Sequence, residues 1–208
     1  MQKLCLFSLI IAFVLVSTTV YSAERVPIGN GDIAVKLDYI NFTDDVLENS
    51  DVDTGFFIGL EGYAKIAPNL HLGVEIGYAN PDGNISGCIF VPSYGTVCGS
   101  ADTEVTFVPI ELNLKYAIKA APNFIIDFGA GVSNTYVKEE ATVSALGISA
   151  SASVDDWLFG GQFFADLNYT IGQFFLGINA KYQLTEDFKD FNYNYNNWRI
   201  GGQIGIMF

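Results

Sequence analysis

The sequence predicts an all-β fold, namely an eight-stranded antiparallel up-and-down transmembrane β-barrel. Three observations support this prediction: apolar and polar residues alternate with a period of two in eight segments, the connections between the segments are alternately long and short, and the chain ends inside the last segment. Such alternation is typical of strands whose two faces meet unlike environments. The predicted strands are residues 33–39, 56–65, 70–78, 108–116, 124–133, 157–169, 174–183 and 198–208.

The N-terminus has the features of a secretory signal peptide. Lys3 precedes an apolar run from Leu4 to Val16, and small or polar residues follow as far as Ser22. The run is too short to span a bilayer as a helix, but it has the length of a signal-peptide core. We therefore expect residues 1–22 to be removed and residues 23–208 to form an exported barrel domain.

Composition excludes some classes of function. The chain has 10 Lys and Arg against 23 Asp and Glu, a net charge of −13, which argues against nucleic-acid binding. Half of the residues are hydrophobic, which excludes a disordered chain. Once the signal peptide is removed, Cys88 and Cys98 are the two cysteines that remain. In an exported chain we expect them to form a disulfide.

The connections indicate which end of the barrel is which. Residues 67–69, 120–123 and 170–173 form short connections. The long connections are residues 43–54, 81–103, 137–156 and 185–197. Because long and short connections alternate strictly, all the long ones leave the barrel at one end. This is the pattern of an outer-membrane barrel with short periplasmic turns and long extracellular loops. Within them, residues 141–154 are small and uncharged, and they either extend a hairpin above the membrane or are mobile.

Side-chain volume distinguishes this barrel from a soluble, lipocalin-like one. The apolar face of each strand carries several large residues, more than the interior of an eight-stranded barrel can hold. The opposite face is rich in Gly and other small residues. Tyr39, Tyr116, Trp157 and Trp198 lie near strand ends, where an aromatic girdle meets the membrane interface. The apolar face is therefore expected to contact lipid.

Two stretches resemble a known family. Val-Pro-Ile-Glu-Leu-Asn-Leu-Lys-Tyr at residues 108–116 and Phe-Gly-Ala-Gly-Val at residues 128–132 look like the fourth and fifth strands of small outer-membrane β-barrels. That family includes the OmpA transmembrane domain, OmpW-like proteins and opacity-type proteins. The resemblance implies a monomer in the outer membrane of a Gram-negative-type bacterium, in contact with lipid and lipopolysaccharide. The terminal Phe208 resembles the signal that the barrel-assembly machinery reads, and residues 198–208 are expected to close the barrel against residues 33–39 so that no strand edge faces lipid.

The inward face carries a set of ionisable side chains that we expect to form a network in the lumen. Its members are Lys36, Asp38, Glu61, Lys65, Glu75, Glu111, Lys115, Asp127, Asp166, Lys181 and Arg199. Six acids against five bases predict a nearly neutral interior. Because buried charges persist when they are paired, and because eight strands leave a lumen just filled by side chains, a plug of ion pairs is favoured over a channel.

The sequence predicts no enzyme, no cofactor and no nucleic-acid partner. His71 is the only histidine, and at the start of a strand it more readily terminates the lumen network than activates a serine. The expected role is structural or in surface interactions. The alternative is an OmpW-like passage of small hydrophobic compounds through a lateral opening.

The long connections concentrate acidic residues at the predicted extracellular end. These acids favour divalent cations as possible partners, and the aromatic residues within 188–195 favour host or phage ligands. Asp51 and Asp53 superficially match the start of a calcium loop, but the later ligands and the bidentate Glu are missing. We therefore expect no dedicated metal site.

Overall fold

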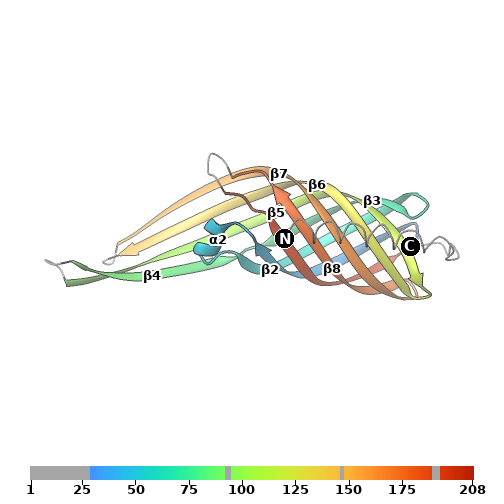
Figure 1. Cartoon of the computed structure of the whole chain (residues 1–208), viewed down its shortest axis with the longest axis horizontal. Coiled ribbons are helices and arrows are strands. Elements are labelled where there is room, and N and C mark those ends of the chain that lie inside the picture. The colour runs from blue at the N-terminus through green and yellow to red at the C-terminus, as the bar shows by residue number, and fades with distance from the viewer. Residues whose placement is uncertain (1–28, 92–94, 146–147, 189–192) are drawn as a thin grey trace, which may run out of the picture.

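The computed structural model describes residues 29–91, 95–145, 148–188 and 193–208 (Figure 1). The predicted signal peptide, residues 1–22, lies outside them. The described elements are β1 (Gly31–Phe42), α2 (Asp45–Asn49), β2 (Thr54–Ala67), β3 (Leu70–Ala79), β4 (Asp82–Val91), β5 (Gly95–Ala121), β6 (Phe124–Ala145), β7 (Ile148–Ile171), β8 (Phe174–Thr185) and β9 (Asn197–Met207). None of the helices in this part of the chain has the length and apolarity needed to cross a bilayer.

Eight of the strands form a closed antiparallel ring. Around the ring the order is β1-β2-β3-β5-β6-β7-β8-β9, and β9 pairs with β1 to complete it. That seam runs from Asp32↔Met207 to Phe42↔Asn197. The predicted eight-stranded barrel, and its closure by the last strand against the first, are confirmed.

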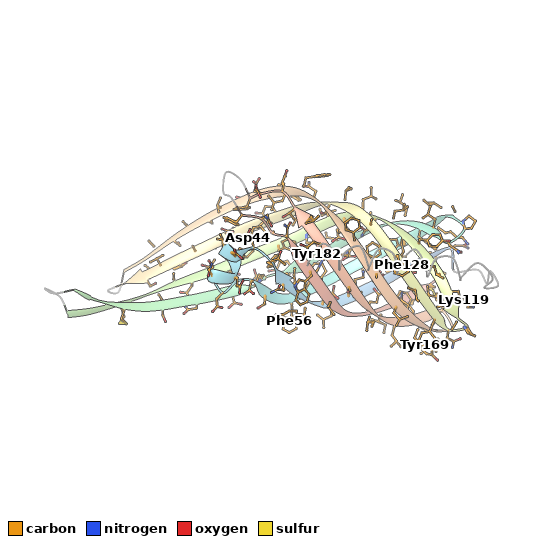
Figure 2. The ribbon with its side chains drawn as sticks, viewed as in Figure 1. Asp44, Phe56, Lys119, Phe128, Tyr169 and Tyr182 are labelled. Atoms are coloured by element: carbon orange, nitrogen blue, oxygen red, sulfur yellow. A yellow bond between two sulfur atoms is a disulfide. The ribbon has the colours of Figure 1, made fainter. Side chains whose placement is uncertain are left out.

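Burial follows the predicted alternation. On β1, Lys36 is 1% exposed and Leu37 is 61% exposed, and on β9 Arg199 is 0% exposed and Ile204 is 64% exposed. The apolar side chains therefore point outward, and the charged ones point into the lumen. In Figure 2 the side chains of Phe56 and Tyr169 project away from the barrel wall.

Two short turns depend on residues that tolerate the left-handed backbone region. Asn69, between β2 and β3, has φ 64°, and Gly172, between β7 and β8, also has φ 64°. Asn and Gly adopt this conformation at low cost, so the chain reverses within a few residues at this end. We call it the short-turn end, and the opposite one the long-loop end.

At the long-loop end, β5, β6 and β7 continue past the ring and form a projecting sheet together with β4 (Figure 1). The strand β4 pairs with β5 alone, while β5, β6 and β7 stay in register as far as Gly99↔Ala145 and Ala145↔Ile148. Much of the predicted loops 81–103 and 137–156 is therefore strand, and the prediction of loops there was wrong. Residues 141–145 and 148–154 are paired strand, so of the two possibilities for residues 141–154 the described part agrees with the extended hairpin.

Candidate functional site

Two carboxylates lie at the centre of the lumen. Glu75 on β3 and Glu111 on β5 are directly opposed across neighbouring strands, and each is 1% exposed. Lys181 Nζ is 2.6 Å from Glu75 Oε2 and 2.5 Å from Glu111 Oε2. The Arg199 guanidinium donates to Glu111 Oε1 at 2.5 Å. Each acid therefore shares its charge with a cation supplied by β8 or β9, from across the lumen.

Lys36 extends this network to β1 and β2. Its Nζ is 2.7 Å from Glu61 Oε2 and 3.3 Å from Glu75 Oε2. The Arg199 guanidinium also lies 4.2 Å from the centre of the Phe57 ring, a cation–π contact. Because the side chains of the whole network come from six of the ring strands, the network ties opposite walls of the barrel together.

Neutral amides and hydroxyls complete the middle of the lumen. Gln183 Nε2 donates to Ser133 Oγ and Thr135 Oγ1, both at 3.0 Å, and Gln183 Oε1 accepts from Arg199 at 3.1 Å. Asn113 donates to Glu111 Oε2 at 3.1 Å. The sequence prediction named only ionisable residues, although these neutral groups lie in the same inward phase of the alternation.

A second cluster occupies the short-turn end. Lys115 Nζ donates to both oxygens of Asp32 at 2.9 Å and lies 3.8 Å from the centre of the Tyr63 ring. His71 is buried, with Nε2 3.5 Å from the carbonyl oxygen of Gly29. Asp32 was missing from the predicted network, although it has the same phase as Lys36. Predicted Lys65 is only half-buried at this end, and no ion pair of it occurs within the described residues.

The charge balance of the lumen differs from the expected near-neutrality. Within the described part of the chain the buried acids are Asp32, Asp38, Glu61, Glu75, Glu111, Asp127 and Asp166, against Lys36, Lys115, Lys181 and Arg199. Seven acids thus face four permanent cations. The difference arises because Asp32 points inward and Lys65 lies near the open end of the barrel.

Above the network, at the long-loop end, an apolar cluster fills the mouth of the barrel. It consists of Ile40, Phe42, Leu47, Val52, Phe57, Ala79, Val105, Phe107, Val137, Leu158, Phe188 and Tyr195, with Val154 and Tyr193 packed against it. We call this set the apolar cap. It joins α2 and the segment between β8 and β9 to the barrel wall, so the lumen is covered where it would open to the exterior.

Glu139 anchors the segment between β8 and β9. The hydroxyl of Tyr193 donates to Glu139 Oε1 at 2.8 Å, and the hydroxyl of Tyr195 donates to the same oxygen. Burial and the adjacent Glu139 carboxylate hold the pKa of Tyr195 far above its usual range. Both tyrosines therefore remain donors at any physiological pH.

The other predicted site residues lie outside the lumen. Cys88 and Cys98 form the expected disulfide, between directly opposed positions of β4 and β5. Asp53 accepts a hydrogen bond from Asn41 Nδ2 at 3.2 Å, and Asp51 is exposed. Among the described residues no three His, Cys, Asp or Glu side chains form a group that could hold a metal ion. Phe208 exchanges two backbone hydrogen bonds with Gly31, each 3.0 Å long.

Several of the acidic residues predicted for the loops lie on the projecting sheet. In one cross-strand row Asp82 lies opposite Glu104, which lies opposite Glu140, and in the next row Asn84 lies opposite Asp102. These side chains border a groove of about 510 Å³. This surface is strongly negative and continues the outward face of the barrel above the membrane.

Comparisons with known proteins agree with this architecture. The profile of the family described as "Outer membrane protein beta-barrel domain" matches residues 8–201. Neisserial surface protein A has a similar structure, with a TM-score of 0.58 and 11% identity over 88% of this chain and 100% of the other. A search of curated protein sequences gave no significant match.

Two further solved structures are similar at lower scores. The N-terminal β-barrel domain of Pseudomonas aeruginosa OprF has a TM-score of 0.48 and 11% identity, over 88% of this chain and 100% of that domain. Ail, the attachment invasion locus protein of Yersinia pestis, has a TM-score of 0.46 and 12% identity, over 86% of this chain and 100% of the other. The family profile spans most of the chain, and the eight-stranded ring is the fold of such barrels. The chain therefore belongs to the outer-membrane β-barrel domain family and resides in the outer membrane of a Gram-negative bacterium.

Proposed function

We propose that this protein is a non-conducting, non-enzymatic barrel whose role is structural or in surface interactions, carried by its extracellular part. The observation behind this proposal is that the lumen is filled in two successive layers. The ion-pair network occupies the membrane level, and the apolar cap covers it on the extracellular side. A solute would have to displace both buried charges and packed aromatic rings to pass.

The projecting sheet is the part of the molecule best placed for contact with other surfaces. Its two outer edges are β4, which pairs only with β5, and the stretch of β7 before Phe159, whose strand pairing is with β6. Free edges offer unpaired backbone groups to an extended segment of another chain. The acidic rows on its outward face would favour divalent cations shared with lipopolysaccharide phosphates. Both features support an extracellular role.

Nothing in the described lumen favours catalysis. Members of this family are mostly non-enzymatic. His71 lies at the short-turn end beside Gly29 and Lys115, and the lumen carboxylates near the centre are engaged with Lys36, Lys181 and Arg199. Catalysis by a nucleophile requires a neighbouring base that is free to accept its proton, and these engaged side chains do not provide one.

Conductance measurements test the filled lumen. Protein refolded and inserted into planar lipid bilayers is expected to give no stable unitary current, because both layers block the lumen. A general porin in the same bilayers provides the positive control. Large, stable steps from the purified protein would overturn the proposal.

One observation favours the lateral passage as a second candidate. Between β3 and β5 the paired positions go from Ile76↔Ile110 directly to Ala79↔Phe107, and Pro109 in this interval has no N–H to donate. On the lumen side the interval is filled by the Phe57 ring, which a Cβ on Gly77 would meet at 1.9 Å. The wall is therefore interrupted in its hydrogen bonding and closed by a side chain.

Replacing Phe57 tests this second candidate. In cells that produce Phe57→Ala, uptake of a small hydrophobic dye should rise several-fold over wild type if Phe57 closes a lateral path. Phe56→Ala, on the outward face of the same strand, is the matched control because Phe56 is 75% exposed. Equal uptake by all three proteins would remove the lateral-path candidate.

A further inference from the structure

The ion pairs of the lumen leave three acids over. Every buried cation of the described residues has at least one carboxylate partner, and the carboxylates paired in this way belong to Asp32, Glu61, Glu75 and Glu111. Within the same part of the chain, Asp38, Asp127 and Asp166 form no ion pair. Each is 3% exposed, so bulk water screens the charge of none of them.

These three acids lie in one cross-strand row. Asp127 on β6 is opposed to Asp166 on β7, Asp166 to Asn179 on β8, Asn179 to Gly201 on β9, and Gly201 to Asp38 on β1. Asn179 Nδ2 donates to Asp38 Oδ1 at 2.9 Å, which satisfies one oxygen of Asp38. The other two acids stand next to each other without an intervening donor.

Asp166 and Asp127 are the least satisfied of these groups. Neither carboxylate oxygen of Asp166 has a hydrogen-bond partner among the described residues, and Oδ1 of Asp127 has none either. The other oxygen of Asp127 accepts from Asn168 Nδ2 at 2.8 Å. Directly opposed side chains on antiparallel strands have Cβ atoms about 5 Å apart, and like charges there repel. Water can donate hydrogen bonds to such a pair, but it does not cancel the charge.

A further buried oxygen is connected to this pair. Gln203 is 6% exposed, and its Oε1 has no partner among the described residues. Its Nε2 donates to Asn168 Oδ1 at 2.7 Å, and Asn168 in turn donates to Asp127. Carboxylate and amide oxygens, without sulfur or imidazole, are the ligands of hard cations such as Ca²⁺ and Mg²⁺.

A small cavity at the periplasmic end reaches Asp127. It has a volume of about 10 Å³ and is lined by Asp32, His71, Lys115, Ala117, Ile125, Asp127, Asn168, Phe175 and Met207. That is about the space of one water-sized particle. The apolar cap covers the opposite end, so this cavity is the route by which a small particle reaches Asp127, and through it the opposed Asp166.

We propose that Asp127 and Asp166 form an internal binding site for one divalent hard cation, Ca²⁺ or Mg²⁺, which enters from the periplasmic end. Two carboxylates balance its charge, Gln203 Oε1 supplies a further oxygen ligand, and the cavity beside Asp127 leaves room for one water in its coordination. The site needs only two carboxylates, which is consistent with the absence of a three-acid group in the described residues. The cation would join β6 to β7 and to β9 across the lumen.

Titration calorimetry with CaCl₂ tests the site. Protein folded in detergent micelles is first stripped with EDTA, and folding of each variant is verified by its heat-modifiable gel mobility. Wild type is expected to bind one internal Ca²⁺, and Ca²⁺ should raise its thermal unfolding midpoint. Asp166→Asn should lose affinity at least tenfold, and its unfolding midpoint should no longer respond to Ca²⁺. Because this change removes an unpaired charge, the metal-free variant should unfold at a higher temperature than metal-free wild type.

A matched variant separates this site from the acidic outer surface. Asp102→Asn combined with Glu104→Gln removes two exposed carboxylates of the projecting sheet and should leave the internal binding unchanged. The proposal is overturned if Asp166→Asn binds Ca²⁺ as wild type does. It is also overturned if wild type at pH 7.5 binds neither Ca²⁺ nor Mg²⁺, since the pair would then be neutralised by protons.

Discussion

Replacing Glu111 with alanine is expected to destabilise the folded barrel by about 3–5 kcal/mol, the cost typical of removing one partner from a buried ion pair. Glu111 accepts from Arg199 and is in ion-pair contact with Lys181, and both cations are buried. Without it, Glu75 alone must balance them, at 3.6 Å from Arg199. Urea unfolding of the protein in lipid vesicles, followed by tryptophan fluorescence, measures the effect.

Two further variants locate the origin of this loss. Glu111→Gln keeps the hydrogen-bond acceptor and removes the charge. Its stability should therefore lie between that of wild type and that of Glu111→Ala. Glu140→Ala removes a carboxylate that pairs with Lys138 at 2.9 Å on the exposed sheet, and it should cause no measurable loss. If Glu111→Ala loses no more stability than Glu140→Ala, the network does not hold the barrel together.

The barrel itself is predictable because its signal is local. In each ring strand, alternate residues face lipid or the lumen. A pattern such as Lys36, Leu37 and Asp38 therefore predicts directly which side chains face the lumen and which face lipid. The same pattern fixes the register of the seam, since a shift of one residue would place Arg199 in lipid. Phase alone also predicts that Glu75 and Glu111 point inward.

The projecting sheet could not be predicted in the same way. Residues 149–153 are exposed on both faces, so the alternation of Ser and Ala there does not point to a buried face and does not distinguish a paired strand from a solvated segment. Backbone pairing with β6 keeps them extended. Which strand lies beside them is determined by the order of strands around the barrel, not by these residues themselves. Sequence reasoning therefore leaves open whether residues 141–154 form a hairpin, and only the paired strands decide it.

Partner choice within the lumen is equally non-local. Lys181 reaches Glu75 across a sequence separation of 106 residues, and no spacing rule connects the two. An inward count of acids and bases came close to neutrality because Asp32 was overlooked and Lys65 was included. The three unpaired acids emerge only when each cation is assigned to its partner in space.

Deleting Phe208 is expected to reduce the amount of protein in the outer membrane far more than it weakens the folded barrel. In the folded state Phe208 contributes two backbone hydrogen bonds to Gly31, and its ring is 62% exposed on the outer surface. Two such bonds are worth about 1–3 kcal/mol, a loss that a barrel closed along the whole of β1 and β9 can tolerate. A large fall in cellular level would therefore reflect recognition during assembly, which is the role proposed for this residue.

Comparing refolded and cellular protein separates the two contributions. The truncated protein, refolded in vesicles, should unfold at a urea concentration only slightly below that of wild type, while outer-membrane fractions of producing cells should contain several-fold less of it. Phe174→Ala is the matched control, because Phe174 is another lipid-facing ring, 54% exposed, on the neighbouring strand β8 at the same end of the barrel. It should accumulate like wild type. Normal outer-membrane levels of the truncated protein would show that Phe208 acts only as the last residue of the seam.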